Sequence, residues 1–452
     1  MIPEGIFRAY DIRGVYGKDL TEEIVQRIGR AFAAYMDGEG KTVLLGRDIR
    51  LSSKPLGDAF SKGMLEGGLN VEDVGTVTTP LLNWASVHYK KDGGVMVTAS
   101  HNPAEWNGLK IWAGNSFISM GMGMEALRDL AVKGKFPRSS SGHSSKYANA
   151  IKNYEGYVSK KVKIEKDQRI IADPGNGSCC LLTPSLFQKT GITVDAINTK
   201  PDGTFPAHSP EPNEETMSEA KRLVLKKKSD FGVGFDGDGD RAVFVDDTGR
   251  MVSSTDIFLM LTEHYLERRR GAAVVYEVSC SLAVEETIKA YGGKPVLSRV
   301  GHTYIADKML KENAVFGGET SGHFYFMDVY GFDDAMFTCL KVAEVLSKRG
   351  QKFSEIVDSL PKYPRIPGKS YECAEEKKFL VVEKLAKDFA DMGYSTVTID
   401  GVKVIEDEGW FLIRPSNTQP LVRLTVEAKT EENLQKLASL ADEKITKIIK
   451  TA

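Results

Sequence analysis

Three aspartates alternate with glycines in the stretch FDGDGDR, which ends an apolar run. The carboxylates of Asp236, Asp238 and Asp240 can converge on one point, because the intervening glycines permit the tight backbone that this requires. A ligand set made only of oxygens suits a hard cation such as Mg²⁺. The alternative is a solvated acidic turn, but the apolar residues before the loop predict the end of a buried strand.

A second polar stretch, TASHNP, follows the apolar run GVMV. Ser100 has His101, Asn102 and Lys110 nearby in the sequence, and these neighbours make it a candidate nucleophile. Most serines at the end of a strand are turn or cap residues, which is the simpler interpretation. No G-x-S-x-G elbow surrounds Ser100, so the residues do not predict an α/β-hydrolase.

Two further polar loops, GGETSGH and RPSNTQP, also follow apolar runs. The second combines a guanidinium fork with hydroxyl and amide donors, and it therefore predicts a pocket for an anion such as phosphate. A satisfied surface turn is the alternative for this loop. The donors are those of Arg414, Ser416, Asn417 and Thr418.

The elements that must position these loops alternate between strand-like and helix-like runs. Runs such as TVLLG, VEDVG and GVMVTAS are separated by helical segments, and the same rhythm restarts at RIIADPGNG and at AAVVYEVSC. This rhythm predicts mostly parallel sheets with crossover helices, in which ligands collect beyond the carboxyl ends of the strands. The loops ASHNP, DGDGDR and GGETSGH occupy that position in three successive units.

The last part of the chain has a different pattern. Helical runs enclose the strand-like runs STVTIDGVKVIE, GWFLIRP and LVRLTVEA, which predicts helices packed on an antiparallel sheet. The predicted fold class is α/β, with three similar mixed α/β domains followed by a smaller α+β C-terminal domain around a central cleft. The segments GKFPRSSSGHSS and LPKYPRIPGKS are predicted to be linkers. The predicted domains are residues 1–149, 150–250, 251–365 and 366–452.

The composition is that of a globular chain too long for one core, with 452 residues, 41% hydrophobic and 27% charged. The formal net charge of -2 argues against nucleic acid or an anionic membrane as a partner and favours a small molecule. No apolar run approaches the roughly 20 residues that cross a bilayer. The five cysteines show no CxxC pair and no disulfide spacing, so we expect a reducing compartment and a cytoplasmic location.

One competing motif overlaps the aspartate loop. Gly232, Gly234 and Gly237 match G-x-G-x-x-G, which is typical of a dinucleotide-binding dehydrogenase. The match is weak, because these glycines lie within the predicted strand and loop and no helix is predicted directly after them.

In this order and at this spacing, the four loops resemble the α-D-phosphohexomutase family over nearly all of the chain. The resemblance is closest to its phosphomannomutase/phosphoglucomutase branch. It implies that Ser100 carries a phosphoryl group, and that the three aspartates hold Mg²⁺ together with this phosphoserine. It also places Arg241 and Lys110 beside the metal. His101, His323 and Lys110 are all candidates for the general base, and the sequence does not choose among them.

The resemblance further implies substrate contacts in the other motifs. GETSGH resembles the family's sugar-recognition loop, and RPSNT its phosphate-binding loop. FRAYDIRG resembles the entry motif, and RVGHT a loop of the third domain near the substrate. The implied substrate-binding residues are Tyr10, Arg13, His302, Glu319, Ser321, Arg414, Ser416, Asn417 and Thr418.

The activity implied by the resemblance is the interconversion of a hexose 1-phosphate and a hexose 6-phosphate, with glucose or mannose as the sugar. A hexose 1,6-bisphosphate is the intermediate and the activator. A phosphoglucosamine mutase with the same mechanism is the main alternative, and a sugar-phosphate-binding protein without turnover is another. A phosphatase is disfavoured, because a cleft closed by a fourth domain limits the access of water.

The sequence leaves two points open. The expected partners are small sugar phosphates, bound by a monomer or a homo-oligomer. Ser279 stands where relatives of this branch often carry a lysine, and Arg299 or Lys110 are candidates to provide that cation.

Overall fold

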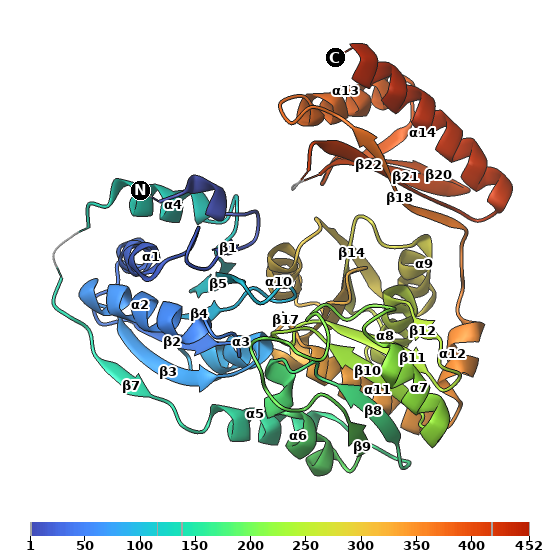
Figure 1. Cartoon of the computed structure of the whole chain (residues 1–452). Coiled ribbons are helices and arrows are strands. Elements are labelled where there is room, and N and C mark those ends of the chain that lie inside the picture. The colour runs from blue at the N-terminus through green and yellow to red at the C-terminus, as the bar shows by residue number, and fades with distance from the viewer. Residues whose placement is uncertain (1, 115, 137–138, 417–418, 452) are drawn as a thin grey trace.

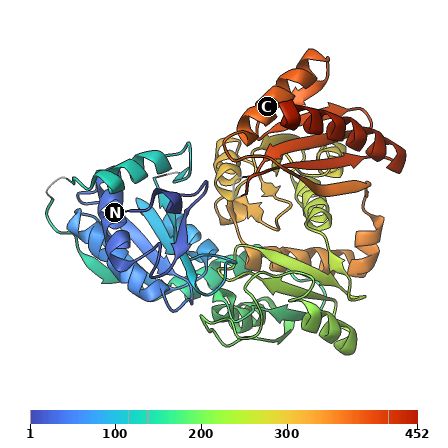
Figure 2. The same cartoon turned by 45° about the horizontal axis from the view of Figure 1, so that its top comes forward.

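The computed structural model describes residues 2–114, 116–136, 139–416 and 419–451. Four sheets follow one another along the chain, and the segments that form them are named the first to fourth domain below. Figure 1 shows the first domain on the left, the second and third together at the lower right, and the fourth above the third. The turned view in Figure 2 shows the same arrangement. The domain boundaries expected from the sequence stay predictions.

The first domain comprises β1 (Ile12–Val15), α1 (Glu22–Tyr35), β2 (Thr42–Arg47), α2 (Ser53–Glu66), β3 (Asn70–Thr76), α3 (Thr79–His88), β4 (Gly93–Val97), β5 (Trp106–Ala113), β6 (Ser116–Phe117), α4 (Met124–Lys133) and β7 (Ser144–Lys146). Its sheet has the order β1-β5-β4-β2-β3-β7, and β6 pairs with β5. Strands β4, β2, β3 and β7 run parallel, whereas β5 is antiparallel to β1, β4 and β6. Thr21 and Thr78 cap α1 and α3, since each hydroxyl accepts a hydrogen bond from a backbone N–H of the first turn.

The second domain comprises α5 (Ala150–Val158), β8 (Arg169–Asp173), α6 (Thr183–Thr190), β9 (Thr193–Ala196), α7 (Ser218–Lys227), β10 (Phe231–Phe235), β11 (Ala242–Asp246) and β12 (Met251–Val252). Its strand order is β12-β11-β10-β8-β9. Strands β10, β8 and β9 run parallel, and β11 is antiparallel to β10 and β12.

The third domain comprises α8 (Ser254–Arg268), β13 (Ala273–Glu277), α9 (Leu282–Ala290), β14 (Lys294–Ser298), α10 (His302–Lys311), β15 (Phe316–Gly318), β16 (Phe324–Phe326), β17 (Phe332–Asp333), α11 (Ala335–Arg349) and α12 (Phe353–Ser359). Its strand order is β14-β13-β15-β16-β17. Strands β14, β13 and β15 run parallel, and β16 is antiparallel to β15 and β17.

The fourth domain comprises β18 (Arg365–Glu372), α13 (Lys378–Asp391), β19 (Ser395–Val397), β20 (Val402–Glu406), β21 (Gly409–Pro415), β22 (Leu421–Ala428) and α14 (Glu431–Thr451). Its sheet, β18-β22-β21-β20-β19, is antiparallel throughout. The expected class of three mixed α/β domains followed by an α+β domain is therefore confirmed.

The first three sheets are less parallel than the alternating pattern predicts. In each of them the strand after a polar loop turns back and pairs antiparallel with the strand before it, as β4 does with β5, β10 with β11 and β15 with β16. The polar loops are thus the short connections 98–105, 236–241 and 319–323. A short connection held by paired strands at both ends has little freedom, which suits side chains that must be placed accurately.

Both segments expected to be linkers contribute strands. β7 lies at the end of the Ser/Gly-rich segment and pairs with β3 as an edge strand. β18 includes most of the proline-rich segment, and its pairing with β22 shifts register between Ile366 and Lys369. Pro367 lies at this irregularity, where the sheet tolerates a residue without an N–H.

One continuous core joins the second and third domains, and it also includes the side of the first domain formed by α3 and its neighbours, with Leu81, Trp84 and Met96. The rings of Phe231 and Phe244, from β10 and β11, lie 6.0 and 6.5 Å from the ring of Phe353 in α12. Helix α11 is buried along nearly its whole length. The fourth domain instead has its own core between its sheet and α13 and α14. The two middle domains therefore form one packing unit.

All five cysteines are buried and unpaired. Among the described residues, no helix is both long enough and apolar enough to span a bilayer.

We predict that Phe337→Ala destabilises the two middle domains together. Phe337 is fully buried in α11, and its ring lies 5.0 Å from that of Phe326. The cavity should cost about 3–5 kcal/mol, and differential scanning calorimetry should show one shifted transition for both domains. Leu225→Ala is the control, because Leu225 is 54% exposed. Separate transitions, with only the third domain shifted, would contradict a shared core.

Candidate active site

The serine of TASHNP and the first aspartate of DGDGDR meet across two domains. Ser100, between β4 and β5, donates from Oγ to Asp236 Oδ2 at 2.8 Å. The other carboxylate oxygen of Asp236 accepts from the N–H groups of Gly239, Asp240 and Arg241 at 3.0–3.1 Å. The loop backbone therefore folds around its own first side chain, which faces the serine hydroxyl.

The serine loop is held closely on two sides. A β-carbon on Gly237 would lie 2.4 Å from the Ser100 carbonyl oxygen, so only glycine allows this approach of the two loops. On the other side, Arg13 of β1 donates to Asn102 Oδ1 at 2.8 Å and pairs with Asp11 at 2.5 Å. Arg13 therefore lies beside the serine loop, and its role in binding substrate stays a prediction.

Three buried carboxylates form the cluster expected from the alternation of aspartate and glycine. Ligand atoms of Asp236, Asp238 and Asp240 lie within 4.8 Å of one another. Lys110 of β5 donates to Asp238 at 2.7 Å and to Asp240 at 2.5 Å. Thr79, at the start of α3, donates its hydroxyl to Asp238 at 2.6 Å. The first domain thus provides Lys110 and Thr79, as well as Ser100, as side-chain donors to the carboxylates of the second.

The donor atoms of this cluster fit a hard cation. Oδ1 of Asp238 and Oδ1 of Asp240 are buried and accept no hydrogen bond from the described residues. Burying a carboxylate oxygen without a donor is costly unless a cation lies near it, and His323 Nδ1 lies 3.7 Å from Asp240 Oδ1. Asp240 also belongs to a second group with His323 and Asp333, which mixes a nitrogen with the oxygens. The all-oxygen group is the better match to Mg²⁺.

Lys110 makes the pKa values of the three carboxyl groups differ. Burial raises the pKa of Asp236 well above its ordinary value, and the charges of Asp240 and Asp238 raise it further. Burial acts in the same direction on Asp238 and Asp240, but their pKa values are lowered, because Lys110 acts with the Thr79 hydroxyl on Asp238 and with His323 and Arg241 on Asp240. The same two contacts raise the pKa of Lys110 against the effect of its burial. Lys110, Asp238 and Asp240 are therefore charged at neutral pH.

Arg241 connects the aspartate loop to His101. Its guanidinium donates to His101 Nδ1 and, at 3.1 Å, to Glu211 Oε1. His101 Nδ1 also lies 3.2 Å from Ser100 Oγ. Burial, followed by the charges of Arg241 and Arg13, lowers the pKa of His101 to about 3. The imidazole is thus neutral at pH 7 and accepts a hydrogen bond from Arg241 beside the serine.

The loop GETSGH of the third domain contacts the aspartate loop of the second. His323 pairs with Arg241 through an isolated β-bridge, and its Nδ1 lies 2.7 Å from Asp333 and 3.7 Å from Asp240. Burial opposes protonation, but Asp240 and Asp333 outweigh it and raise the pKa of His323 to about 9. Of the three candidate bases, His323 and Lys110 therefore hold their protons at neutral pH.

Glu319 and Ser321 lie in the same loop. The Tyr325 hydroxyl donates to Glu319 Oε1 at 2.5 Å, and Ser321 Oγ donates to Glu319 Oε2 at 3.1 Å. Burial raises the pKa of Glu319. The carboxylate is thus fixed by two hydroxyl donors.

Tyr10 and His302 join the first and third domains. The Tyr10 hydroxyl donates to the Val300 carbonyl at 3.0 Å, and its ring lies edge-on to His302 with centroids 5.9 Å apart. The His302 ring stacks on His323 at 6.1 Å. Burial lowers the pKa of His302 well below its ordinary value, so this imidazole is neutral.

Arg414 is a residue of the fourth domain whose charge acts on Tyr10. Its Nη2 pairs with Asp400 at 2.9 Å. Burial, followed by Asp400, raises the pKa of Tyr10 to about 12, whereas Arg414 acts in the opposite direction and Glu319 raises it. Charged groups of the third and fourth domains therefore lie close enough to act on a tyrosine of the first.

The rest of the RPSNTQP loop is described in part. Ser416 is buried, and its Oγ accepts from the Gln419 N–H at 3.2 Å. Asn417 and Thr418, which the sequence assigns to the phosphate pocket, lie outside the described residues.

Cations of the fourth domain contact the segment around Ser279. The Ser279 hydroxyl donates to Glu277 Oε1 at 2.7 Å. Lys403 Nζ donates to the Val278 carbonyl at 2.8 Å, and Arg365 donates to the Ser279 carbonyl at 2.8 Å. Burial lowers the pKa of Lys403 to about 8. These contacts connect the fourth domain to the third.

The G-x-G-x-x-G match does not belong to a dinucleotide site. Gly232 and Gly234 lie within β10, and the antiparallel strand β11 follows the loop. A dinucleotide site needs a helix N-terminus directly after the glycines. The dehydrogenase alternative is therefore excluded.

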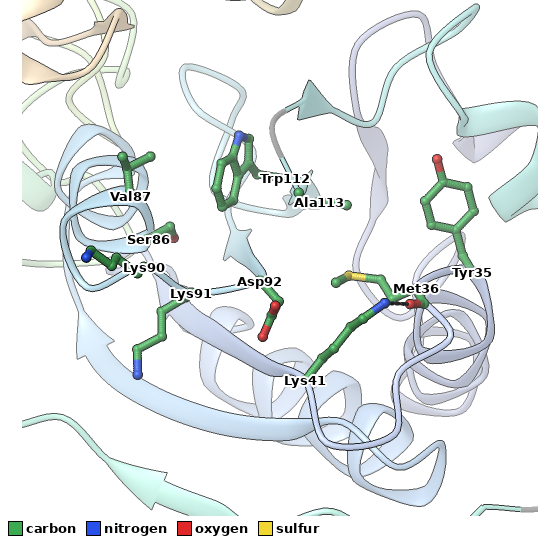
Figure 3. Close-up of a pocket in the computed structure, with 11 residues that line it drawn as sticks. Tyr35, Met36, Lys41, Ser86, Val87, Lys90, Lys91, Asp92, Trp112 and Ala113 are labelled. Atoms are coloured by element: carbon green, nitrogen blue, oxygen red, sulfur yellow. Dashed lines mark hydrogen bonds between the residues drawn. The ribbon is translucent and has the colours of Figure 1, made fainter.

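A cavity of about 520 Å³ lies near the amino ends of β2 and β4 in the first sheet (Figure 3), whereas Ser100 lies beyond the carboxyl end of β4. Lys41 and Asp92, which line it, directly precede β2 and β4. Lys41 Nζ donates to the Met36 carbonyl at 2.5 Å, as the dashed line shows. Ser100 follows the carboxyl end of β4, so the length of that strand separates this cavity from the site.

The sequence patterns do not single out several charged residues of the site. Asp48 and Arg50 follow β2 at the same sheet edge as Ser100, so the argument from polar residues after strands could have found them. No hydrophobic periodicity or motif spacing in the sequence points to Glu211 or Asp333. Their part in the site depends on contacts with distant segments.

Models of the phosphoglucomutase/phosphomannomutase alpha/beta/alpha domains I, II and III match residues 4–121, 145–249 and 254–363. The model of the C-terminal domain matches residues 371–444. A phosphoglucomutase/phosphomannomutase of Thermococcus kodakarensis is 36% identical over 451 residues, which cover 96% of this chain and 97% of that protein. The chain belongs to the phosphoglucomutase/phosphomannomutase family. The resemblance carried by the four loops is thereby confirmed.

Other members of the phosphoglucomutase/phosphomannomutase family extend the comparison. A solved structure of a family protein from Burkholderia thailandensis superposes with a TM-score of 0.91 at 31% identity, covering 99% of this chain and 98% of that one. A Methanothermobacter thermautotrophicus protein named "Probable phosphoglucosamine mutase" is 35% identical over 433 residues, 94% of each chain. This phosphoglucomutase/phosphomannomutase family member is therefore a phosphohexomutase enzyme, and its relatives differ in the sugar that their names state.

Proposed function

We propose that this phosphohexomutase interconverts the 1-phosphates and 6-phosphates of glucose and mannose through phospho-Ser100 and a hexose 1,6-bisphosphate. The observation that carries the proposal is the 2.8 Å contact between Ser100 Oγ and Asp236 Oδ2. It joins a candidate nucleophile to a buried carboxylate cluster, which is the combination that phosphoryl transfer needs.

Ser100 Oγ is the phosphoryl carrier in this reaction. The 6-hydroxyl of a hexose 1-phosphate attacks the phosphorus, the bond to Ser100 Oγ breaks, and the bisphosphate forms. The 1-phosphate of the bisphosphate then passes to Ser100, and the hexose 6-phosphate leaves. In the first transfer the proton of the 6-hydroxyl passes to Ser100 Oγ. In the second the proton of Ser100 Oγ passes to the sugar O1, so the two steps together need no outside proton.

Charged groups around Ser100 neutralise the phosphoryl oxygens. When held by Asp236, Asp238 and Asp240, Mg²⁺ would withdraw charge from these oxygens. Lys110 and Arg241 place further positive charge at the junction of the two loops, where the Arg241 guanidinium contacts His101. Positioning and charge neutralisation are most of what phosphoryl transfer asks of a protein. His323 holds a proton at neutral pH and is suited to donate it.

The remaining loops hold the sugar phosphate in either of two orientations. Glu319 and Ser321 accept and donate hydrogen bonds to the 3- and 4-hydroxyls, and Tyr10 and Arg13 line the entry. Arg414, with Ser416, Asn417 and Thr418, binds the phosphate that is not reacting. Both orientations are needed, because the bisphosphate must present each end in turn to Ser100.

The sugar is assigned from two features. Glucose and mannose differ only at the 2-hydroxyl, whereas Glu319 and Ser321 are proposed to bind positions that both sugars share. The residue in the third-domain loop is a histidine, His302, and an imidazole provides no negative charge for the ammonium group of an amino sugar. The five buried, unpaired cysteines agree with the cytoplasmic location that the sequence favours.

The phosphoserine is tested by mass. After incubation with glucose 1,6-bisphosphate, the intact protein should gain one phosphate at Ser100. Ser100→Ala should gain none and lose mutase activity by several orders of magnitude, because the carrier oxygen is absent. An active preparation without phosphate on Ser100 would remove the proposed mechanism.

The metal site is tested with Asp238→Asn. Replacing an anionic ligand by a neutral one should weaken Mg²⁺ binding by more than about tenfold in titration calorimetry and slow turnover at limiting Mg²⁺. Asp334→Asn is the control, because Asp334 is equally buried near the loop but caps α11, which asparagine also does well. Equal Mg²⁺ affinities for the two variants would show that the metal binds elsewhere.

The sugar is tested by comparing kcat/KM for three substrates. Glucose 1-phosphate and mannose 1-phosphate should differ by less than roughly tenfold, and glucosamine 1-phosphate should be the poorest substrate. A preference for the amino sugar would overturn the sugar assignment and favour a phosphoglucosamine mutase, while the phosphoserine mechanism would stand.

A further inference from the structure

Arg50 directs four of its five guanidinium donors at the segment from Ser100 to Trp106. Its side chain, at the carboxyl end of β2, is 0% exposed. The five N–H groups that arginine offers donate to Asp48 Oδ2 and to four backbone carbonyls. These are the carbonyls of Ser100 at 2.8 Å, Asn102 at 2.6 Å, Pro103 at 2.5 Å and Trp106 at 3.2 Å.

Ser100 has a backbone conformation that needs such support. Its φ is +52°, in the left-handed region that residues other than glycine seldom adopt. Its carbonyl accepts from Arg50, and its N–H donates to Thr98 Oγ1 at 2.9 Å. The Thr98 hydroxyl in turn donates to Asp48 Oδ2 at 2.7 Å. Both backbone polar groups of Ser100 are therefore tied to one buried unit of Asp48, Arg50 and Thr98.

We propose that Arg50 is a positioning residue for phosphoryl transfer. It holds the backbone of Ser100 in the left-handed conformation, so that Oγ faces Asp236 at 2.8 Å. Arg50 acts through the serine and does not touch the substrate, because its side chain has no exposed surface. The inference rests on the proposed role of Ser100 as the phosphoryl carrier.

The second domain closes the other side of this unit. The Phe205 ring centroid lies 5.0 Å from the Arg50 guanidinium carbon, at cation–π distance. The guanidinium is therefore enclosed between the serine loop and the domain that carries the aspartate cluster. A small displacement of Arg50 would move Ser100 relative to Asp236, and misplacement of about 1 Å can slow a reaction by about 10²-fold.

The test compares Arg50→Lys, Thr98→Val and Arg27→Lys in the full-length enzyme. Lysine keeps the charge beside Asp48 but cannot span four carbonyls. Thr98→Val is nearly isosteric and removes the hydrogen bond from the Ser100 N–H together with the one to Asp48, while it leaves Arg50 in place. Arg27→Lys is the control, because Arg27 also donates to two carbonyls of the first domain, those of Ala131 and Val132, away from the serine loop.

For Arg50→Lys, kcat with glucose 1-phosphate should fall by about 10²-fold while KM stays near the wild-type value. The rate at which glucose 1,6-bisphosphate phosphorylates Ser100 should fall by the same factor. Thr98→Val should lose about tenfold in both rates, and Arg27→Lys should keep both.

A wild-type rate of Ser100 phosphorylation in Thr98→Val and in folded Arg50→Lys would overturn the inference. So would a raised KM with unchanged kcat, or a lowered melting temperature with unchanged kcat. If Arg50→Lys does not fold, Thr98→Val decides by the same rates. If the wild-type enzyme gains no phosphate on Ser100, the proposed function fails and the positioning role falls with it.

Discussion

Three carboxylates lie buried in the short loop from Asp236 to Asp240, and such a concentration of negative charge is unstable in a protein interior unless cations meet it. Lys110 meets two of these carboxylates from the first domain, and Arg241 lies on the same loop. Separating the first two domains would expose the carboxylates and leave Lys110 without its two carboxylate partners. The charge that suits the loop to a metal and a phosphoryl group therefore also holds the domains together.

The mixed sheets explain how three loops reach one point. A purely parallel unit would lead from each strand into a crossover helix, whereas here each polar loop returns directly into an antiparallel neighbour. The loop is then anchored at both ends in the same sheet. The second and third domains share one core, to which α3 of the first domain also contributes, so their loops have a fixed relation to each other. The fourth domain is held differently, by a small apolar cluster around Trp410 and by polar contacts of Lys403 and Arg365.

The imidazoles of His101 and His323 differ in charge, because the charged groups beside them differ in sign. Both are buried, which disfavours the charged form. His101 lies against Arg241 and stays neutral, whereas His323 lies against Asp240 and Asp333 and is protonated. The site therefore offers a neutral acceptor beside Ser100 and a charged donor beside Asp240.

The sequence by itself determined the elements of this site. Local patterns identified the three strand-end loops, the aspartate cluster, Ser100 and the antiparallel fourth domain, because periodicity and turn chemistry depend on neighbouring residues. The tertiary structure decided the rest. The antiparallel return of β5, β11 and β16 depends on pairing that no local pattern encodes, and the charge states of the histidines depend on groups far away in the chain. The role of Arg50 has the same origin, since its partners Ser100 to Trp106 lie about fifty residues further on and only the sheet brings β2 and β4 together.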